Sequence, residues 1–154
     1  MDLSTLHPNV TAADPRAAID FYVAGLGAEV IDTITAGDTI IHSDLRVTSS
    51  RGASTFTVAA AFPSEGAVAP EPDGPTTGSF TLYVDDADAA HARAVAAGAR
   101  STQEPGDWFP GFRQAAVRCP AGQRWFFAQV ADHVTAADVQ RASDAWMADA
   151  GSAG

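Results

Sequence analysis

The hydrophobic and polar positions of residues 3–62 follow the pattern of a strand, a helix and three further strands. Asp14 is a typical helix N-cap, and Pro15 fits the first helical turn, where its missing N–H costs nothing. Apolar residues then recur at helical spacing to about Ala24, and glycines follow them. Alternating segments predict strands over 28–35, 39–47 and 55–62, after a first strand over 3–10.

The same order of elements returns after residues 63–77, a segment rich in proline and glycine that is typical of a linker. Residues 79–84 predict a strand, and the pair Asp85-Asp86 caps a helix that ends near Gly98. Short strands are expected over 99–102, 112–118 and 124–130, and an amphipathic helix over 134–150.

Two copies of one supersecondary unit define the predicted fold. We expect an α+β protein whose paired βαβββ modules, 3–62 and 78–132, form a curved mixed sheet around a pocket, followed by a C-terminal helix within 133–150. The length of 154 residues fits one domain over 1–154. Each helix covers one face of its own sheet, so the opposite faces must cover each other or a ligand.

The charge of the chain excludes several classes of partner. Its 9 basic and 19 acidic side chains give a formal net charge of -10, which repels nucleic-acid phosphates and anionic headgroups. The sequence shows neither a signal-peptide pattern nor the roughly 18 unbroken apolar residues of a membrane span, so we expect a cytoplasmic protein. The single cysteine, Cys119, excludes an intramolecular disulfide. A small molecule is the expected partner, rather than nucleic acid or a membrane.

A run of residues in the first module resembles a known family. Residues 14–22 (DPRAAIDFY) and 25–29 (GLGAE) are similar to the opening motif of the vicinal oxygen chelate superfamily, which includes glyoxalase I, extradiol dioxygenases, fosfomycin-resistance enzymes and bleomycin-binding proteins. Residues 42–46 (HSDLR), 82–88 (LYVDDAD) and 118–122 (RCPAG) also resemble this family, with Cys119 in place of its aspartate. The resemblance covers roughly residues 5–132 and implies a homodimer.

The resemblance also indicates where a metal would bind. Metal-binding members of the superfamily carry ligands on the first and fourth strand of each module, from a His/Gln/Glu set. By this resemblance His7 takes one ligand position, whereas Ser79, Phe126 and either Thr57 or Ala59 take the others. Because one side chain cannot hold a catalytic divalent ion, we expect no metal and no other cofactor.

Strand alternation assigns the side chains that would line the pocket. The polar faces of the two modules carry His7, Asn9, His42, Asp44, Thr57, Ser79, Tyr83 and Phe126. A structural interpretation stays open for each of them, as a half-buried histidine, a solvated strand face or a packing residue. His7 and Asp44 would form an acid–base pair if the fold brings them together.

Residues 105–113 (PGDWFPGFR) are the most unusual stretch. We expect an aromatic connection in which Trp108, Phe112 and Arg113 form a wall over a flat ligand. A lid on the core and a contact with a second subunit are the other interpretations. His91 is expected on the surface, on the polar side of the second helix.

Three functions are compatible with these observations. The leading one is metal-independent binding of an aromatic or cationic small molecule, as in the bleomycin-resistance branch. The alternative is a metal-independent isomerase, cyclase or lyase that uses His7 or His42 as general base, with Asp44 as a further catalytic candidate. The third is an interaction module that self-associates through the C-terminal helix, with Trp146 and Met147 at the contact.

Overall fold

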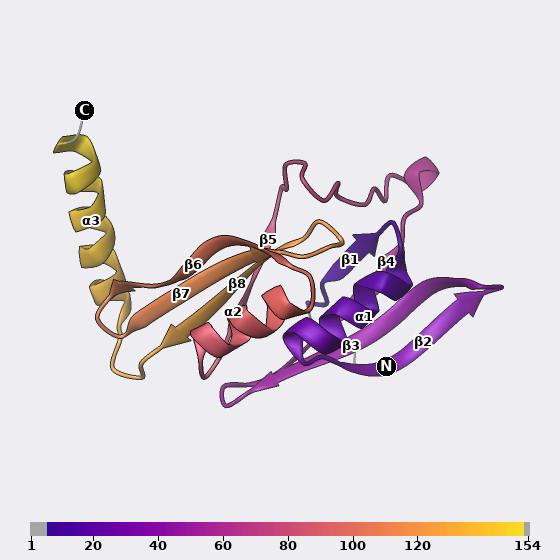
Figure 1. The fold of residues 1–154 in the computed structure, drawn as a ribbon, viewed down its shortest axis with the longest axis horizontal. Coiled ribbons are helices and arrows are strands. Elements are labelled where there is room, and N and C mark those ends of the chain that lie inside the picture. The colour runs from indigo at the N-terminus through magenta and orange to yellow at the C-terminus, as the bar shows by residue number, and fades with distance from the viewer. Residues whose placement is uncertain (1–5, 153–154) are drawn as a thin grey trace.

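The computed structural model describes residues 6–152 and contains two four-stranded mixed sheets and three α-helices (Figure 1). In the first sheet the strands β1 (Asn9–Ala12), β2 (Glu29–Ala36), β3 (Thr39–Ser49) and β4 (Gly52–Ala60) lie in the order β1-β4-β3-β2. In the second sheet β5 (Ser79–Tyr83), β6 (Arg100–Phe109), β7 (Phe112–Arg118) and β8 (Arg124–Val130) lie in the equivalent order β5-β8-β7-β6. This repetition confirms the predicted α+β class with paired modules.

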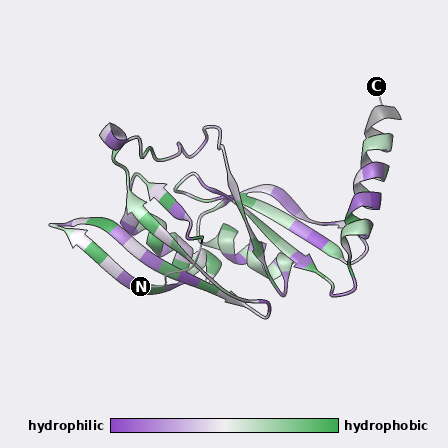
Figure 2. Ribbon diagram, turned by 180° about the vertical axis from the view of Figure 1, so that it is seen from behind, coloured by the Kyte–Doolittle hydropathy of each residue, from purple (hydrophilic) through white to green (hydrophobic). Residues whose placement is uncertain are grey.

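The helices begin where the sequence places their caps. Asp14 accepts a hydrogen bond from Ala17 N at the start of α1 (Pro15–Leu26), and Asp86 accepts one from Ala89 N at the start of α2 (Ala87–Ala96). The third helix, α3 (Ala136–Ser152), projects away from both sheets in both views of the chain (Figures 1 and 2). Among residues 6–152, no helix is long and apolar enough to cross a membrane.

The helix-covered faces of both sheets share one hydrophobic core. Its centre is a group of three aromatic rings, in which the centroid of Tyr22 lies 5.3 Å from Phe56 and 5.6 Å from Trp125, and Phe56 lies 5.6 Å from Trp125. Tyr22 comes from α1, Phe56 from the first sheet and Trp125 from the second. Because this contact joins the modules by their inner faces, each sheet turns its other face outward.

The two module helices also touch, with α1 beside α2 (Figure 1). A Cβ at Gly25 would lie 2.9 Å from the ring of Phe21 and 3.2 Å from the Cβ of Ala97, so the approach requires glycine. Arg93 of α2 donates hydrogen bonds of 3.0 Å to the carbonyls of Gly25 and Leu26, which satisfies the free carbonyls at the end of α1.

Two strand predictions need correction. The expected first strand over 3–10 is displaced, because β1 begins at Asn9. Residues 6–8 precede it, and of their backbone groups the carbonyl of Pro8 accepts a 2.9 Å hydrogen bond from Thr57 N of β4. Residues 3–5 lie outside the described part. The expected aromatic connection over 105–113 is instead the tip of the β6–β7 hairpin. Register shifts in β6 accommodate its proline and glycine, and Gly111, with φ 87°, provides the turn after Pro110.

The prediction of a surface position for His91 is wrong. Its side chain is 6% exposed, and its Nε2 lies 2.8 Å from the Oγ of Ser101 on β6. The buried residues of α2 are Ala87, Ala90, His91 and Ala94, which recur at helical spacing and face the sheet. His91 therefore belongs to the packed stripe of α2, where the hydroxyl of Ser101 satisfies one ring nitrogen.

Candidate functional site

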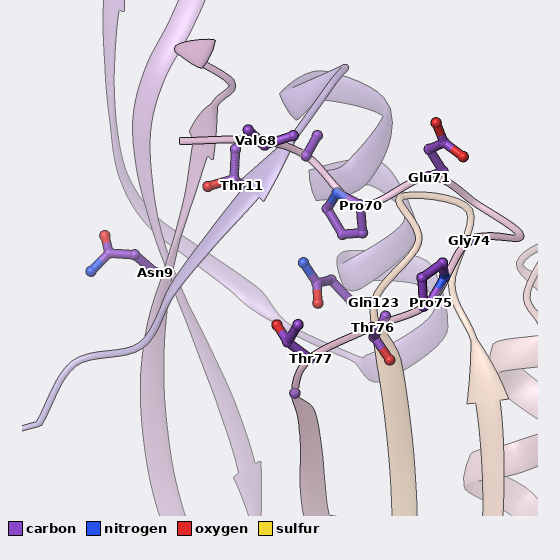
Figure 3. A pocket seen from close by; sticks show the side chains of 12 residues that line it. Asn9, Thr11, Val68, Pro70, Glu71, Gly74, Pro75, Thr76, Thr77 and Gln123 are labelled. Carbon is purple, nitrogen blue, oxygen red and sulfur yellow. The ribbon is translucent and has the colours of Figure 1, made fainter. Parts of the chain in front are cut away.

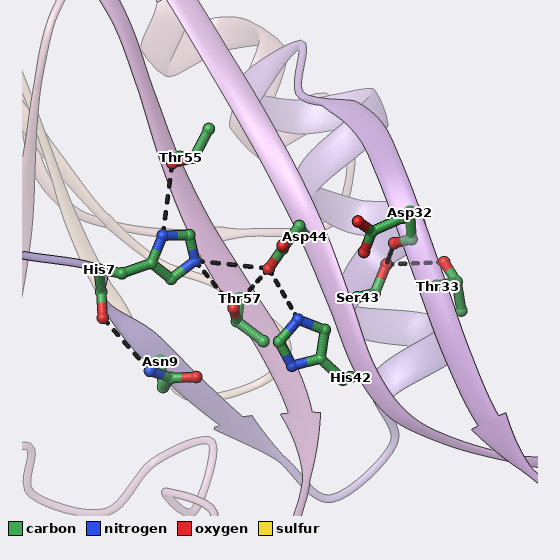
Figure 4. Close-up of polar contacts among 9 residues, drawn as sticks. All are labelled: His7, Asn9, Asp32, Thr33, His42, Ser43, Asp44, Thr55 and Thr57. Carbon is green, nitrogen blue, oxygen red and sulfur yellow. Dashed lines mark hydrogen bonds and ion pairs between the residues drawn. The ribbon is translucent and has the colours of Figure 1, made fainter. Parts of the chain in front are cut away.

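One row of side chains crosses the outer face of the first sheet. The strand register pairs Asp32 with Asp44, Asp44 with Thr57 and Thr57 with Asn9, so these four residues share a face across β2, β3, β4 and β1. His42 precedes Asp44 by two positions and lies on the same face (Figure 4). The outer face of the first sheet is thus polar at its centre, while its inner face packs in the core.

Asp44 lies at the centre of this group. Its side chain is only 2% exposed, and its Oδ1 accepts a 2.6 Å hydrogen bond from the hydroxyl of Thr57. The Nε2 of His42 lies 3.0 Å from the same oxygen, and the Nε2 of His7 lies 3.4 Å from it (Figure 4). His7 Nε2 also lies 2.9 Å from the Oγ1 of Thr57. The structure therefore brings together His7 and Asp44, the predicted acid–base pair, and adds His42 to it.

The environment keeps Asp44 ionised. Burial of the side chain raises the pKa of a carboxyl group, but the hydrogen bond from Thr57 and the nearby imidazoles of His42 and His7 lower it by more. The net result is a pKa below the ordinary value for aspartate. Asp44 is therefore a buried negative charge whose stabilisation comes from the three side chains around it.

A metal-type donor group lies within this row. One donor atom each from Asp32, His42 and Asp44 lies within 4.8 Å of the other two. Asp32 was not among the residues predicted from the sequence, because its position beside Asp44 depends on the register of β2 against β3. Strand alternation gave no signal for it, because Val30 and Ile34, two positions to either side, are apolar and would share its face in a regular strand.

The ligand positions expected from the family resemblance do not fit a metal in this chain. The hydroxyl of Thr57 is bonded to Asp44, Ser79 is an exposed strand residue, and Phe126 carries a ring. The guanidinium carbon of Arg124 lies 4.5 Å from the centroid of that ring. Of the expected ligand positions, His7 alone offers a ligand that transition metals bind well.

The outer face of the second sheet is aromatic. The register pairs Thr81 with Phe126, Tyr83 with Ala128, and Phe112 with Val130, so Ser79, Tyr83, Phe112 and Phe126 share this face. Tyr83 is 49% exposed and Trp108 is 44% exposed. The ring of Trp108 lies 5.5 Å from Phe112 in an edge-on arrangement. This face therefore presents aromatic surface to solvent in a single chain.

Arg113 lies apart from these aromatic residues. It follows Phe112 in β7 and therefore faces the helix side of the sheet, where its guanidinium pairs with Asp88 of α2 and with Asp107 of β6 at 2.9 Å. These hydrogen bonds raise its pKa above the ordinary arginine value. Trp108 and Phe112 therefore lie in contact, as expected for the aromatic wall. Arg113 does not join them, because its guanidinium forms ion pairs with Asp88 and Asp107 of its own module.

A groove of about 470 Å³ lies between β1, residues 68–78 and the turn before β8 (Figure 3). Asn9 lines it, and its side-chain amide donates a 3.2 Å hydrogen bond to the carbonyl of His7. The linker wall is held in place by Arg118, which donates to the carbonyls of Glu71 and Gly74. Asn9 therefore lies between this groove and the polar row.

The chain belongs to the Glyoxalase/Bleomycin resistance protein/Dioxygenase superfamily, whose model matches residues 4–127. No curated protein sequence matches the chain significantly. Among solved structures, it is similar to TioX from Micromonospora sp. ML1, with 26% identity and a TM-score of 0.61 over 84% of this chain and 100% of the other. It also matches a glyoxalase/bleomycin resistance protein/dioxygenase from Nocardioides (19% identity, TM-score 0.60, 88% and 89% covered).

Glyoxalase I from Zea mays shares the fold at 21% identity and a TM-score of 0.60. That match covers 82% of this chain and 44% of the maize chain. At this level of identity the similarity shows a shared fold only. The chemistry of this chain depends on its own side chains.

The Asp44→Asn variant tests the assigned role of the buried carboxylate. Because the pKa of Asp44 is lower in the folded chain than the roughly 3.9 of an unfolded aspartate, its charge stabilises the fold above about pH 4. This contribution is lost as the pH falls through the folded-state pKa. We expect the variant to unfold about 1–3 kcal/mol more easily at pH 7, and the difference to shrink at pH 3.

Urea denaturation of both proteins at the two pH values measures this difference. Asp20→Asn, at an exposed position of α1, controls for the removal of one surface charge. A stability difference for Asp44→Asn that is the same at pH 3 and pH 7 would contradict the assigned ionisation.

Proposed function

We propose that this chain binds an aromatic or cationic small molecule without the aid of a metal. The observation that carries the proposal is the aromatic outer face of the second sheet, which presents Tyr83, Phe126 and the Trp108–Phe112 pair. Of these, Phe126 stands at a position where the family resemblance implies a metal ligand in metal-dependent members. Flat ligands stack on such rings, because aromatic contacts add about 0.5–1.5 kcal/mol to the gain from burying apolar area.

The charge distribution favours a neutral or cationic ligand. The net charge of -10 attracts cations and repels anionic headgroups and nucleic-acid phosphates. On the first sheet, Asp44 provides a buried negative charge beside His7, His42, Thr57 and Asn9, the other polar residues of the proposed ligand site. The free thiol of the buried Cys119 accords with a cytoplasmic location, which we propose as well.

A homodimer is part of this proposal. Ser79, Thr81 and Tyr83 of β5 are exposed along the outer face of the second sheet, so one chain alone leaves that face open. A second copy that covers the outer faces would enclose the ligand and bury the aromatic surface. Exposed Trp146 and Met147 on α3 provide a further apolar contact for the second copy.

Ligand binding is tested with a panel of planar aromatic probes that are cationic, neutral or anionic. We expect saturable binding of at least one cationic or neutral probe in the presence of EDTA, measured by tryptophan fluorescence and calorimetry. Phe126→Ala and Trp108→Ala should each weaken this binding about 10-fold, since an aromatic contact is worth roughly 1.4 kcal/mol.

Phe62→Ala is the matched control, because Phe62 is a similarly exposed aromatic residue (44%) that lies beyond β4, outside the proposed face. Its affinity should equal that of the unchanged chain. The proposal fails if no probe in the panel binds saturably, or if all three variants weaken binding equally.

A second candidate function is metal-independent isomerase, cyclase or lyase chemistry with a histidine base. The observation in its favour is that two imidazoles contact one ionised carboxylate, which can hold a histidine in a fixed orientation. His42 is the better base of the two, because its Nε2 faces Asp44 and its side chain is 33% exposed. Both nitrogens of His7 lie near threonine hydroxyls.

If the chain is an enzyme of this type, the double variant His7→Ala/His42→Ala should lose turnover and keep its circular dichroism spectrum. His42→Ala alone should account for most of that loss, because removal of a general base typically costs about 10²–10⁴-fold in rate. His133→Ala, at an exposed histidine, is the control. An unchanged rate in the double variant would eliminate this mechanism.

The proposed dimer is tested by sedimentation velocity. We expect the full chain to sediment as a dimer, because the exposed apolar surface of one copy is costly in water. Tyr83→Glu, which places a charge on the outer face of β5, should shift the distribution toward monomers. A truncation after residue 133 separates the contribution of α3 from that of the sheets. A monomer at all concentrations would contradict the homodimer.

A further inference from the structure

The polar row of the first sheet contains a mixed histidine and carboxylate group whose convergence on one place the proposed function does not explain. We propose that Asp32, His42 and Asp44 form a binding site for one divalent transition-metal ion on the outer face of the first sheet (Figure 4). All three residues come from the β2–β3 pair, so the site lies within one module. It differs from the ligand positions of the family resemblance, which are spread over both modules and do not fit a metal here.

The spacing of the donor atoms suits such an ion. Two ligands that each lie about 2.1 Å from a metal are about 3.0 Å apart at a right angle and about 3.4 Å apart at a tetrahedral angle. The Nε2 of His42 and the Oδ1 of Asp44 are 3.0 Å apart. A carboxylate oxygen of Asp32 lies within 4.8 Å of one donor atom each of His42 and Asp44, so the three side chains converge on one place.

The electrostatics of the row also favour a cation. Asp32 and Asp44 are directly opposite each other in the register of β2 and β3, where two like charges destabilise a sheet. A divalent ion between them replaces this repulsion with two attractions. The Nε2 of His42 already lies 3.0 Å from Asp44 Oδ1, so the imidazole is directed at the carboxylate that would share the ion with it.

The side chains around Asp44 fix the orientation of this carboxylate before any metal ion binds. Thr57 donates to Asp44 Oδ1 at 2.6 Å, and the Nε2 of His7 lies 3.4 Å from the same oxygen and 2.9 Å from the Thr57 hydroxyl. Such outer partners fix the orientation of a ligating carboxylate and strengthen metal binding. His7 and Thr57 are therefore positioning residues for Asp44 in this site.

The donor set indicates the class of ion. One imidazole with two carboxylates suits zinc, manganese, iron or cobalt, whereas calcium and magnesium prefer sites made of oxygen ligands alone. The metal site shares His42 and Asp44 with the proposed ligand site, whereas the rings on which the ligand would stack belong to the other sheet. Ligand binding in EDTA and metal binding without ligand are therefore separate measurements, and each can fail without the other.

Cobalt(II) titration of the metal-free full chain tests the site, because bound cobalt absorbs visible light when nitrogen and oxygen ligands hold it at low coordination number. We expect one ion per chain, bound with a micromolar or lower dissociation constant, displaced by Zn²⁺ and retained in millimolar Ca²⁺. His42→Ala and Asp32→Asn should each weaken binding at least 10-fold, as removal of a direct ligand requires.

His133→Ala and Asp20→Asn are the matched controls, since they remove an exposed histidine and an exposed aspartate elsewhere. Their affinity for cobalt should equal that of the unchanged chain. Asp32 and His42 are partly exposed, so their variants report on the site even if the buried Asp44→Asn variant does not fold. Absence of saturable binding, or equal affinity in all four variants, overturns the proposal.

Discussion

The contact among Tyr22, Phe56 and Trp125 determines the arrangement of the rest of the chain. It joins α1, the first sheet and the second sheet in one core, with centroid distances of 5.3–5.6 Å. Aromatic residues bury more area than other side chains, so this contact supplies a large part of the energy that holds the modules together. Because it uses the inner faces of both sheets, it leaves the outer faces for polar and aromatic side chains that can bind something else.

The same constraint explains how a carboxylate can be buried outside the core. Asp44 lies on the outer face of β3, while its neighbour Leu45 packs in the core at 0% exposed. The cost of burying that charge is offset by Thr57 from β4, by His42 from its own strand and by His7 from the segment before β1. Because β1 pairs in parallel with β4, the segment before β1 carries His7 to the side of Asp44. The cluster is thus a consequence of sheet order rather than of any local motif.

Periodicity in the sequence was sufficient to predict the order of elements and the repeated module. It also predicted which strand face would be polar, because alternation places His42 and Asp44 together. It could not predict that Asp32 lies beside Asp44, since this depends on a register that includes a shift between Val30 and Asp32. The two errors have local causes. Pro105 and Gly106 are typical of a loop, so the sequence predicted a connection where β6 continues through register shifts. His91 is polar, so the sequence predicted a surface position although its spacing matches that of the buried Ala87 and Ala94.

The charges of the two outer faces bear on the proposed dimer. The outer face of the first sheet carries Asp32 and, beneath its histidines, the buried Asp44. The outer face of the second carries Arg124 beside Phe126, with Arg118 as its cross-strand partner. Two identical copies related by a twofold axis can set the acidic face of one chain against the basic and aromatic face of the other, twice. That pairing would be complementary in charge and would enclose the aromatic surface, whereas contact between two first sheets would bring their carboxylates together. For the proposed homodimer, electrostatics therefore favours contact between the first sheet of one chain and the second sheet of the other.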